Sequence, residues 1–370
     1  MKSEDEILKD IDLNQLPLFH KVAPHTVPEI ELDEVLKNIN QFSLIIDVRS
    51  ESEYQASHLP NAINFPILND EERREVGVIY KHKGKEPATN KALEFSIPKL
   101  SQLKELLSKS ENPSFLIYCW RGGGRSRYTT NEIIKMGFCA KKLKDGHKAW
   151  RKVVHHSLYN SEVPKFLVLK GLTGVGKTEV LRAIQNKFRF LDLEYYARNA
   201  ASSFGRIPFQ ILNDYHFVSQ KSFEEQIYQD LHLNQIPISK HGILAESESR
   251  RIGHLFLSNP LFDQLKESKT ILITCSIEKR VERTYRDYIG NNNEGLQLLF
   301  DDMQKIKKYM SKAEFQKLLE LFEANKIHEL LKVLLLEYYD PKYSGIYKKE
   351  EFCIDSTNMD SAINELLDYL

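Results

Sequence analysis

Residues Phe166-Leu167-Val168-Leu169-Lys170-Gly171-Leu172-Thr173-Gly174-Val175-Gly176-Lys177-Thr178 form the most informative segment of this chain. The apolar run 166–170 predicts a buried strand, and residues 179–187, which follow the segment, predict a helix. The glycine-rich stretch between them therefore has the strand, loop and helix order of a phosphate-binding P-loop. We expect the second half of the chain to be an α/β domain built around this loop.

The P-loop offers hydrogen-bond donors and a positive charge to a di- or triphosphate. Backbone amides at a helix start bind phosphate oxygens, Lys177 neutralises them, and the Thr178 hydroxyl is placed to coordinate Mg²⁺. The residues expected to bind the diphosphate are Gly171, Gly174, Val175, Gly176, Lys177 and Thr178. Whether a nucleoside triphosphate is bound or hydrolysed stays open at this point.

A carboxylate is expected to complete the Mg²⁺ site. Glu246 follows the apolar run 242–245, the place where P-loop folds commonly present a metal-binding acid. Asp192 ends another predicted strand and is the alternative. For each carboxylate, a helix cap or a surface position is as good an interpretation as metal coordination. The candidate metal ligands are therefore Thr178 and Glu246.

A second anion-binding loop precedes the P-loop: Tyr118-Cys119-Trp120-Arg121-Gly122-Gly123-Gly124-Arg125-Ser126. It follows the predicted strand 115–118 and leads into a predicted helix over 126–136. Converging backbone amides, the helix N-terminus and two guanidinium groups stabilise a thiolate, so Cys119 is the candidate catalytic nucleophile. The rest of the anion-binding loop is Trp120, Arg121, Gly122, Gly123, Gly124, Arg125 and Ser126. The alternative is a strand-to-helix turn with an inert buried cysteine.

Length and composition indicate two domains. The chain has 370 residues, more than one hydrophobic core usually serves, and its 41% hydrophobic and 28% charged content is ordinary for a globular protein. Its four cysteines lack metal-ligand spacing, so we expect reduced thiols. The apolar runs are too short for a membrane span and the start is too acidic for a signal peptide, which favours a cytoplasmic protein without a membrane partner.

The charges are unevenly distributed although the formal net charge is zero. Residues 101–160, around and after the cysteine loop, contain 12 Lys or Arg and 4 Asp or Glu. Such a basic segment can attract an anionic substrate or bind an RNA backbone. The alternative is a solvated lysine-rich surface, such as Lys141-Lys142-Leu143-Lys144.

Both halves alternate apolar strands with helical patterns, which is typical of parallel sheets covered by helices. In the first half we predict strands at 44–48 and 115–118, with helical residues over 92–108. In the second half we predict further strands at 190–193, 242–245 and 270–275, followed by nearly continuous helix over 278–339. Because the pattern weakens between 153 and 164, the predicted domains are residues 1–158 and 159–370.

The first half resembles the rhodanese domain through Asp47-Val48-Arg49-Ser50, His58-Leu59-Pro60-Asn61-Ala62-Ile63-Asn64 and the Cys119 loop. Joined to a P-loop half, it resembles the tRNA 2-selenouridine synthase family. Other stretches that resemble this family are Val76-Gly77, Tyr80-Lys81, Asp192-Leu193-Glu194, Ser203-Phe204-Gly205, Glu246-Ser247-Glu248-Ser249-Arg250 and Tyr338-Tyr339-Asp340-Pro341. The resemblance implies an α/β fold class, with an N-terminal rhodanese-like parallel-sheet domain and a C-terminal P-loop NTPase-like domain that has a helical extension.

One stretch departs from the family pattern. The family typically carries a His-Arg-Gly-Ser run after the Asp-Leu-Glu stretch, whereas this chain has Asn199-Ala200-Ala201-Ser202. A basic contact to phosphate or RNA is therefore absent at Ala200 or moved to Arg198.

The resemblance implies an enzyme that converts 2-thiouridine at the wobble position of tRNA to 2-selenouridine. In the family, geranyl diphosphate first alkylates the sulfur, and selenophosphate then supplies the selenium. Carried over to this chain, the P-loop holds the diphosphate, with Mg²⁺, and Cys119 carries selenium while Arg121 and Arg125 hold the departing phosphate. The implied partners are thiolated tRNA, selenophosphate and geranyl diphosphate.

Two other functions are compatible with the motifs. Five residues separate Cys119 from Arg125, one more than in the common sulfur-transferring loop, so the main alternative is a cysteine-dependent phosphatase fused to a nucleotide-binding P-loop domain. The other is a regulatory NTPase with a non-catalytic rhodanese module.

Several further residues have competing structural and functional interpretations. Asp47 and Arg49 are expected to form a structural pair at a strand end, and His58 to stabilise a turn. A solvated helix face, or else contact with tRNA phosphates, is expected for Arg280, Arg283 and Arg286. Core packing, rather than a geranyl channel, is expected for Phe204, Phe209 and Phe217.

Overall fold

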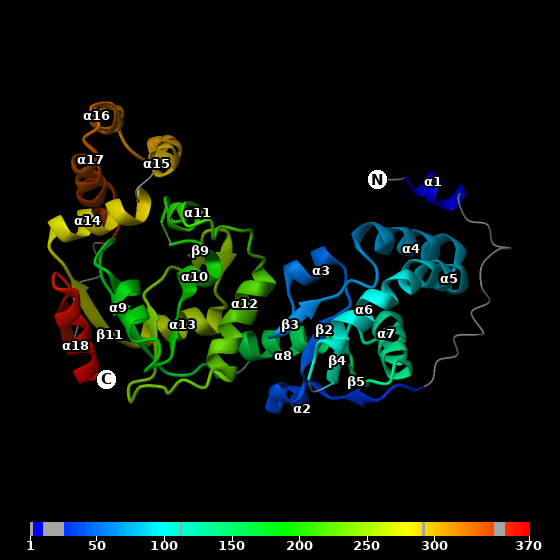
Figure 1. Ribbon diagram of the computed structural model, residues 1–370. Helices are drawn as coiled ribbons and strands as arrows, with labels where there is room; N and C mark the ends of the chain where they lie inside the picture. Colours follow the sequence, from blue (N-terminus) through cyan, green and yellow to red (C-terminus); the bar gives the residue numbers. More distant parts are fainter. Residues whose placement is uncertain are drawn as a thin grey trace. The chain divides into compact units, whose positions relative to one another are not determined.

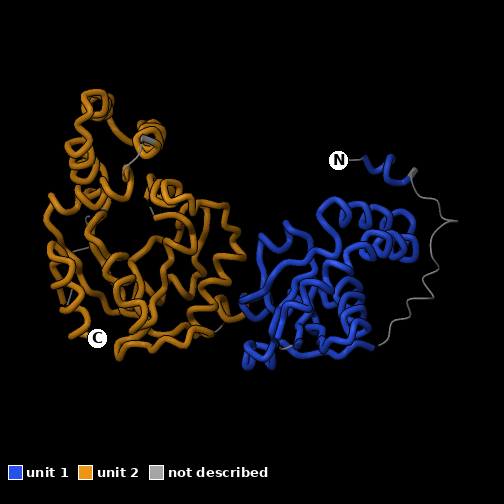
Figure 2. The backbone as a smooth tube through the Cα atoms, in the orientation of Figure 1, with its two compact units in different colours: residues 1–154 blue, residues 155–370 orange. Residues whose placement is uncertain are grey.

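The computed structural model describes residues 3–9, 26–111, 113–160, 162–200, 202–290, 293–343 and 352–370 (Figure 1). The chain forms two compact units, residues 1–154 and residues 155–370 (Figure 2). Helix α8 (His147–Asn160) runs across the division between them. The stretch 153–164, where the sequence pattern weakens, is thus helical up to Asn160.

A sheet of five parallel strands forms the centre of unit 1, in the order β1-β5-β4-β2-β3. The strands are β1 (Glu29–Ile30), β2 (Leu44–Asp47), β3 (Ala62–Asn64), β4 (Ser114–Tyr118) and β5 (Cys139–Leu143). Residues 115–118 of the middle strand β4 are fully buried, as expected for a strand covered on both faces. The strands predicted at 44–48 and 115–118 are confirmed.

The helices of unit 1 pack on the sheet or on one another and position the cysteine loop. They are α1 (Glu4–Lys9), α2 (Leu32–Lys37), α3 (Glu51–Ala56), α4 (Asp70–Lys83), α5 (Lys85–Ser96), α6 (Leu100–Ser108) and α7 (Gly124–Lys135), with short 3₁₀ turns η2 (Ile39–Gln41) and η3 (Ile97–Lys99). Leu103 of α6 and Ile133 of α7 pack in one core with Ile46 and Phe115 of the sheet. The start of α7 therefore lies just beyond the carboxyl end of β4.

The second unit is built on another five-stranded parallel sheet, in the order β12-β11-β6-β8-β7. Its strands are β6 (Phe166–Lys170), β7 (Phe190–Leu191), β8 (Ile243–Glu246), β11 (Lys269–Thr274) and β12 (Phe352–Asp355). A separate antiparallel hairpin joins β9 (Arg251–Ile252) and β10 (Leu255–Phe256). Because β6 is the central strand, the P-loop that follows it sits at the middle of the sheet edge.

The helices near this sheet are α9 (Lys177–Ala183), α10 (Leu193–Ala197), α11 (Ile207–Ile211), α12 (Gln220–Tyr228), η4 (Gln229–Leu233), α13 (Asn259–Glu267) and α18 (Met359–Tyr369). The helix after the P-loop ends at Ala183 rather than at Lys187 as predicted. The chain turns there and brings Phe190 into β7, beside β8.

The predicted helical extension follows β11. It consists of α14 (Ile277–Tyr288), α15 (Asn293–Ile306), η5 (Lys307–Tyr309), α16 (Lys312–Glu323), α17 (Ile327–Val333), η6 (Leu334–Tyr339) and η7 (Asp340–Tyr343). Its core includes Leu299, Met303, Leu330 and Leu335, which are all almost completely buried. Among the helices of the described residues, none has both the length and the apolar character that a membrane span requires.

Candidate functional site

Cys119 directly follows β4 and is 4% exposed. Its Sγ lies 3.2 Å from the hydroxyl oxygen of Ser126, which is buried in the first turn of α7. Gly123 is the N-cap of that helix, so the amides at its start adjoin the cysteine loop. The Ser126 hydroxyl also donates to the Gly123 carbonyl over 3.4 Å, so it lies between the sulfur and the start of α7.

The cysteine loop is held against the turn that follows β5. The backbone amide of His147 donates to the carbonyl of Cys119 over 2.9 Å, and the amide of Lys148 donates to that of Trp120 over 2.9 Å. Gly122 has a φ of 62°, and a Cβ there would come within 2.9 Å of the Leu143 carbonyl oxygen. These contacts fix the loop before any ligand binds.

Lys142 also stabilises the cysteine loop. Its Nζ donates to the carbonyl of Gly122 over 2.6 Å and forms an ion pair with Glu29 at 2.7 Å. The side chain is 7% exposed. The expectation of a solvated lysine surface is therefore wrong for Lys142, whereas Lys144 is exposed and pairs with Glu31.

The two arginines of the cysteine loop have different surroundings. Arg121 is exposed and forms no ion pair with any described residue, so its charge remains available to an anion. Arg125 instead pairs with Glu53 over 2.6 Å, and Arg73 approaches the same carboxylate at 3.6 Å. Burial would raise the pKa of Glu53, but the hydrogen bond and charge of Arg125 outweigh it and lower that pKa. An anion that bound in this loop would therefore share Arg125 with Glu53.

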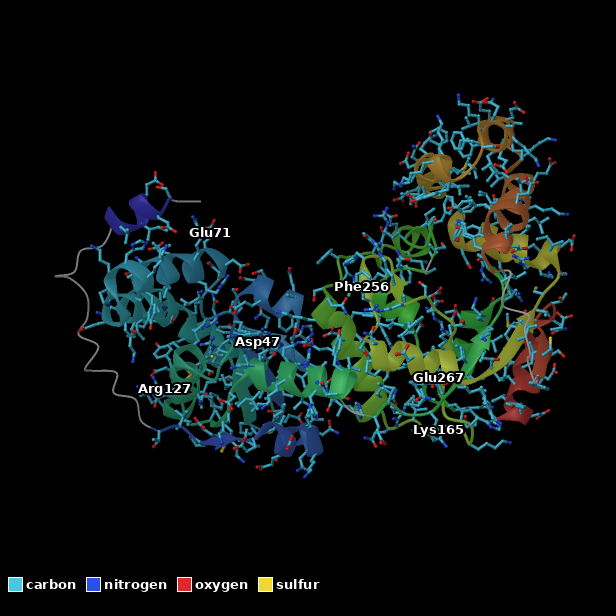
Figure 3. All side chains as sticks on the ribbon, turned by 180° about the vertical axis from the view of Figure 1, so that it is seen from behind. Asp47, Glu71, Arg127, Lys165, Phe256 and Glu267 are labelled. Carbon is cyan, nitrogen blue, oxygen red and sulfur yellow. The ribbon has the colours of Figure 1, made fainter. Side chains whose placement is uncertain are left out.

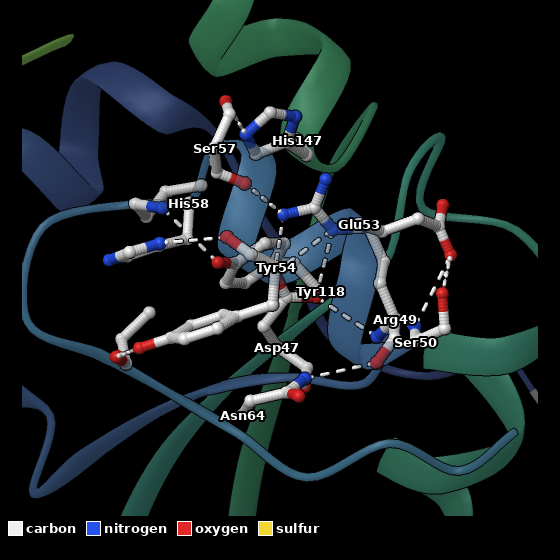
Figure 4. Close-up of polar contacts among 12 residues, drawn as sticks. Asp47, Arg49, Ser50, Glu53, Tyr54, Ser57, His58, Asn64, Tyr118 and His147 are labelled. Carbon is white, nitrogen blue, oxygen red and sulfur yellow. Dashed lines mark hydrogen bonds and ion pairs between the residues drawn. The ribbon is translucent and has the colours of Figure 1, made fainter. Parts of the chain in front are cut away.

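A buried polar network includes Tyr118, the residue before Cys119 (Figure 4). The guanidinium of Arg49 donates to both carboxylate oxygens of Asp47, at 2.5 to 3.0 Å, and to the carbonyl of Ser57 at 2.6 Å. Figure 3 shows Asp47 inside unit 1. Burial, together with the Asp47 charge, raises the pKa of Tyr118 well above its ordinary value, so this phenol stays neutral. The structural interpretation of Asp47 and Arg49 is confirmed.

The neighbouring turn is stabilised by the expected histidine. His58 stacks on Tyr54 with ring centroids 4.1 Å apart, and its Nδ1 lies 3.0 Å from the Tyr54 carbonyl oxygen. A second histidine extends the network, because Nε2 of His147 lies 2.9 Å from the hydroxyl of Ser57. Both histidines thus act in the packing around the loop.

The P-loop has the predicted position between β6 and α9. Lys177, the first residue of α9, donates from Nζ to the Gly171 carbonyl over 3.2 Å. Gly174 has a φ of 79°, and a Cβ there would lie 2.9 Å from the Thr284 hydroxyl oxygen and 3.0 Å from the Arg280 carbonyl oxygen. Helix α14 therefore packs against the loop so closely that only glycine fits at 174.

Two arginines of α14 donate hydrogen bonds to backbone carbonyls of the P-loop. Arg280 donates to the Thr173 carbonyl over 2.9 Å and pairs with Asp340 at 2.6 Å. Arg283 donates to the Val175 carbonyl over 3.0 Å. Both side chains are buried, so the expectation of a solvated face is wrong for them; Arg286 is 57% exposed and pairs with Glu179.

Three carboxylates face the P-loop threonine. One oxygen from each of Glu194, Glu246 and Glu248 lies within 4.8 Å of the others, and the Thr178 hydroxyl donates to Glu194 over 3.3 Å. Burial raises the pKa of all three carboxyls, and repulsion from Glu246 adds to the shift of the other two. The pKa of Glu248 is raised to about 8.

This oxygen cluster suits a hard cation. Mg²⁺ prefers carboxylate and hydroxyl oxygens, and a divalent charge would relieve the repulsion that raises these pKa values. The ligands would be drawn from Thr178, Glu194, Glu246 and Glu248. Asp192 is not among them, since it caps α10 through the amide of Tyr195 and pairs with Arg182 at 2.7 Å.

The other sequence candidates of unit 2 divide between core and surface. Phe204 and Phe209 are buried as expected, but Phe217 is 76% exposed and stacks on His254, so a core position is wrong for it. Arg198 stacks on Tyr195 at 3.8 Å and pairs with Asp214 at 3.4 Å. In the stretch 199–202, which differs from the family pattern, the amide of Ala200 donates to the Gly205 carbonyl, and Ala201 lies outside the described residues.

The two sites define a class of protein in which a rhodanese-like domain with a loop cysteine is joined to a P-loop domain. Residues 31–153 match the family model of the rhodanese-like domain, and residues 164–370 match that of the tRNA 2-selenouridine synthase AAA domain. The chain therefore belongs to the tRNA 2-selenouridine synthase family, as its motifs suggested.

Curated relatives agree with this assignment over most of the chain. The tRNA 2-selenouridine synthase of Sulfurovum sp. (strain NBC37-1) is 30% identical over 81% of this chain and 87% of its own length. The protein of the same name from Chromohalobacter salexigens is 31% identical over 86% of this chain and 90% of its own length. That of Nitrosomonas europaea is 33% identical over 71% of this chain and 68% of its own length.

Proposed function

We propose that the protein converts wobble 2-thiouridine in tRNA to 2-selenouridine in the cytoplasm, in two steps that use its two anion-binding loops separately. The observation that carries the proposal is that family membership spans both units and that each unit retains a complete loop. The P-loop acts in S-geranylation, and the Cys119 loop acts in selenium transfer.

In the first step the thiouridine sulfur attacks the allylic carbon of geranyl diphosphate. A carbon–sulfur bond forms, the carbon–oxygen bond breaks, and diphosphate leaves with the electron pair while N3 of the base loses its proton to water. The P-loop amides and Lys177 would stabilise the leaving diphosphate. Bound Mg²⁺ would supply further charge to that leaving group.

The second step must deliver selenium in the oxidation state of selenide, because the thioether sulfur that it replaces has the corresponding oxidation state. If the Cys119 thiolate attacks the phosphorus of selenophosphate, the phosphorus–selenium bond breaks and selenide leaves. The selenide takes a proton from water and then attacks C2 of the S-geranyl base. Geranyl thiol departs with that proton, and water hydrolyses the phosphocysteine to phosphate and free thiolate.

This route needs no oxidant or reductant. If Cys119 instead carried selenium while phosphate departed, formation of the sulfur–selenium bond would release two electrons, and the step would need an oxidant to accept them. We therefore propose a phosphocysteine, which departs from the expectation of selenium bound to Cys119. The amides of the loop, Arg121 and Arg125 would hold the phosphoryl oxygens, and the Ser126 hydroxyl would stabilise the thiolate as it is regenerated.

Mass spectrometry of nucleosides tests the function. Thiolated tRNA incubated with the protein, geranyl diphosphate and selenophosphate should yield 2-selenouridine, and omission of selenophosphate should leave the S-geranyl nucleoside. If the tRNA stays unchanged while an aryl phosphate is hydrolysed, the phosphatase alternative replaces this proposal. Intact-mass analysis tests the chemistry, since a phosphoryl adduct on Cys119 supports it and a selenium adduct there contradicts it.

A further inference from the structure

A cavity of about 520 Å³ opens beside Cys119 within unit 1. Its walls come from helices α4, α5 and α7, the segment after β3, and the cysteine loop (Figure 1). Most of its lining is apolar, including Ile67, Leu68, Val76, Ala88, Ala92 and Leu93. Selenophosphate is small and ionic, so the apolar lining does not suit it.

The side of the cavity next to the cysteine is positively charged. Arg73, Arg121 and Arg125 line it together with Trp120. Among the described residues, Glu53 forms ion pairs with Arg73 and Arg125 and Asp70 also interacts with the charge of Arg73, whereas Arg121 forms no ion pair. An apolar interior with cationic groups at one side suits a ligand that has a hydrocarbon chain and neighbouring phosphates.

We infer that this cavity binds the geranyl chain of S-geranyl-2-thiouridine tRNA during the selenium step. The inference rests on the proposed function, and it specifies where the S-geranyl intermediate of that function binds. The electrophilic C2 must come to the loop where selenide is released, and the geranyl chain is attached to C2 through one sulfur atom. With C2 near Cys119, the chain therefore has to lie against whatever surrounds that loop, and here the surroundings are apolar.

The same assignment accounts for a sequence stretch that otherwise has no role. Val76, Gly77 and Tyr80 belong to the stretches that resemble the family, and all three line the cavity on one side of α4. Tyr80 is 60% exposed although it is large and aromatic. As an exposed ring in the lining of this cavity, Tyr80 is available to contact a bound hydrocarbon chain.

Geranyl diphosphate offers the same chemistry, a geranyl chain next to phosphate, and is the competing occupant. The two occupants predict different defects. A blocked cavity impairs selenium transfer if it binds the geranylated tRNA, and it impairs geranylation if it binds geranyl diphosphate. Both half-reactions can be followed with the full chain, since the first requires no selenophosphate and the second can start from synthetic S-geranyl RNA.

The first test uses the unaltered protein and two RNA substrates. An anticodon stem-loop that carries S-geranyl-2-thiouridine is compared with one that carries S-methyl-2-thiouridine, each with selenophosphate. We expect kcat/KM for selenouridine formation to be at least about tenfold higher with the geranyl substrate, because methylene groups in an apolar pocket give this order of discrimination. Equal values for the two substrates overturn the inference but leave the proposed function intact, whereas no selenouridine from either overturns both.

The second test fills the cavity. Ala92→Phe places a phenyl ring in the wall, and Ser101→Phe, at an exposed position of α6, is the matched control. We expect Ala92→Phe to lower kcat/KM for the S-geranyl substrate at least about tenfold and to leave the S-methyl substrate and the geranylation of thiolated RNA within about twofold of the unaltered protein. A selective loss of geranylation assigns the cavity to geranyl diphosphate and overturns the inference, as does an equal loss with both alkyl substrates in a variant whose melting temperature is unchanged.

Discussion

The Cys119 loop and the P-loop both follow the carboxyl end of a central parallel strand, yet their electrostatic surroundings are opposite. Arg73, Arg121 and Arg125 surround the cysteine loop, with Glu53 as the nearby acid. The P-loop instead faces three clustered glutamates, while the buried arginines of α14, Arg280 and Arg283, donate to carbonyl groups of the loop. The comparison indicates that an anion at the cysteine loop would meet arginine charges, whereas an anion at the P-loop would meet the negative charge of the glutamates unless a cation offset it.

Loss of the nucleophile should have the largest effect. Cys119→Ser is expected to lower selenouridine formation on the order of 10⁴-fold, as is typical when a covalent nucleophile is removed, because the serine hydroxyl is not ionised at neutral pH. Geranylation of thiolated tRNA should stay within about twofold. Quantitative nucleoside mass spectrometry measures both, and Cys139→Ser, at an exposed cysteine of the same unit, is the control.

Loss of the P-loop lysine should have the reciprocal effect. Lys177→Ala is expected to slow geranylation roughly 10² to 10³-fold, because the charge that stabilises the departing diphosphate is removed. Lys187→Ala, at an exposed lysine after α9, should change the rate little. A geranylation rate that is unchanged in Lys177→Ala would remove the P-loop from this step.

Loss of the serine next to the cysteine should have a moderate effect. Ser126→Ala removes the hydroxyl 3.2 Å from Sγ, and a hydrogen bond to a charged group contributes roughly 1.5 to 3 kcal/mol. The observed rate constant of selenium transfer should therefore fall on the order of tenfold to a hundredfold, and Ser126→Thr should recover most of it. Equal rates for Ser126→Ala and the unaltered protein would show that the hydroxyl does not stabilise the thiolate.

The smallest expected effect is a difference between the two units in how their stability depends on pH. The pKa of Glu248 is raised from 4.5 to about 8 in the fold, so the folded state holds a proton that the unfolded state has lost between these values. Without Mg²⁺, the stability of unit 2 should therefore fall as pH rises from 5 to 8 and level off above about 8. Thermal unfolding should show this slope. Mg²⁺ should flatten it, and Glu248→Gln should reduce it in part, because the pKa values of Glu194 and Glu246 are also raised.

Glu53 gives the opposite sign in unit 1. Because its pKa is lowered in the fold, its contribution to stability is present above the ordinary glutamate pKa and is lost as pH falls through the lowered value. Glu53→Gln should remove this acid-side loss in thermal unfolding experiments. A slope of the same sign in both units would contradict the electrostatic comparison.

The sequence predicted the features that local patterns encode. Both loops, their flanking strands, the helical extension and the Asp47–Arg49 pair follow from apolar runs, glycine spacing and neighbouring charges. The ion pair of Glu53 with Arg125 could not be predicted, because it joins residues that the sheet order brings together.

The remaining site residues depend on tertiary contacts. Glu194 and Glu248 lie in stretches that the family resemblance includes, but only the placement of β7 beside β8 brings them to Glu246. Arg280 and Arg283 look like a solvated helix face in sequence, and their burial depends on carbonyl groups of the P-loop. Phe217 shows the reverse error, since an aromatic residue expected in the core is exposed.

The central claim is that the two loops act in separate, ordered steps, and a rescue experiment tests it most directly. Lys177→Ala and Cys119→Ser are each given selenophosphate with tRNA that already carries S-geranyl-2-thiouridine, and nucleosides are quantified by mass spectrometry. The account predicts that Lys177→Ala forms 2-selenouridine at nearly the rate of the unaltered protein and that Cys119→Ser forms it on the order of 10⁴-fold more slowly. If Lys177→Ala fails on this substrate, or if Cys119→Ser succeeds, the separation of roles is contradicted.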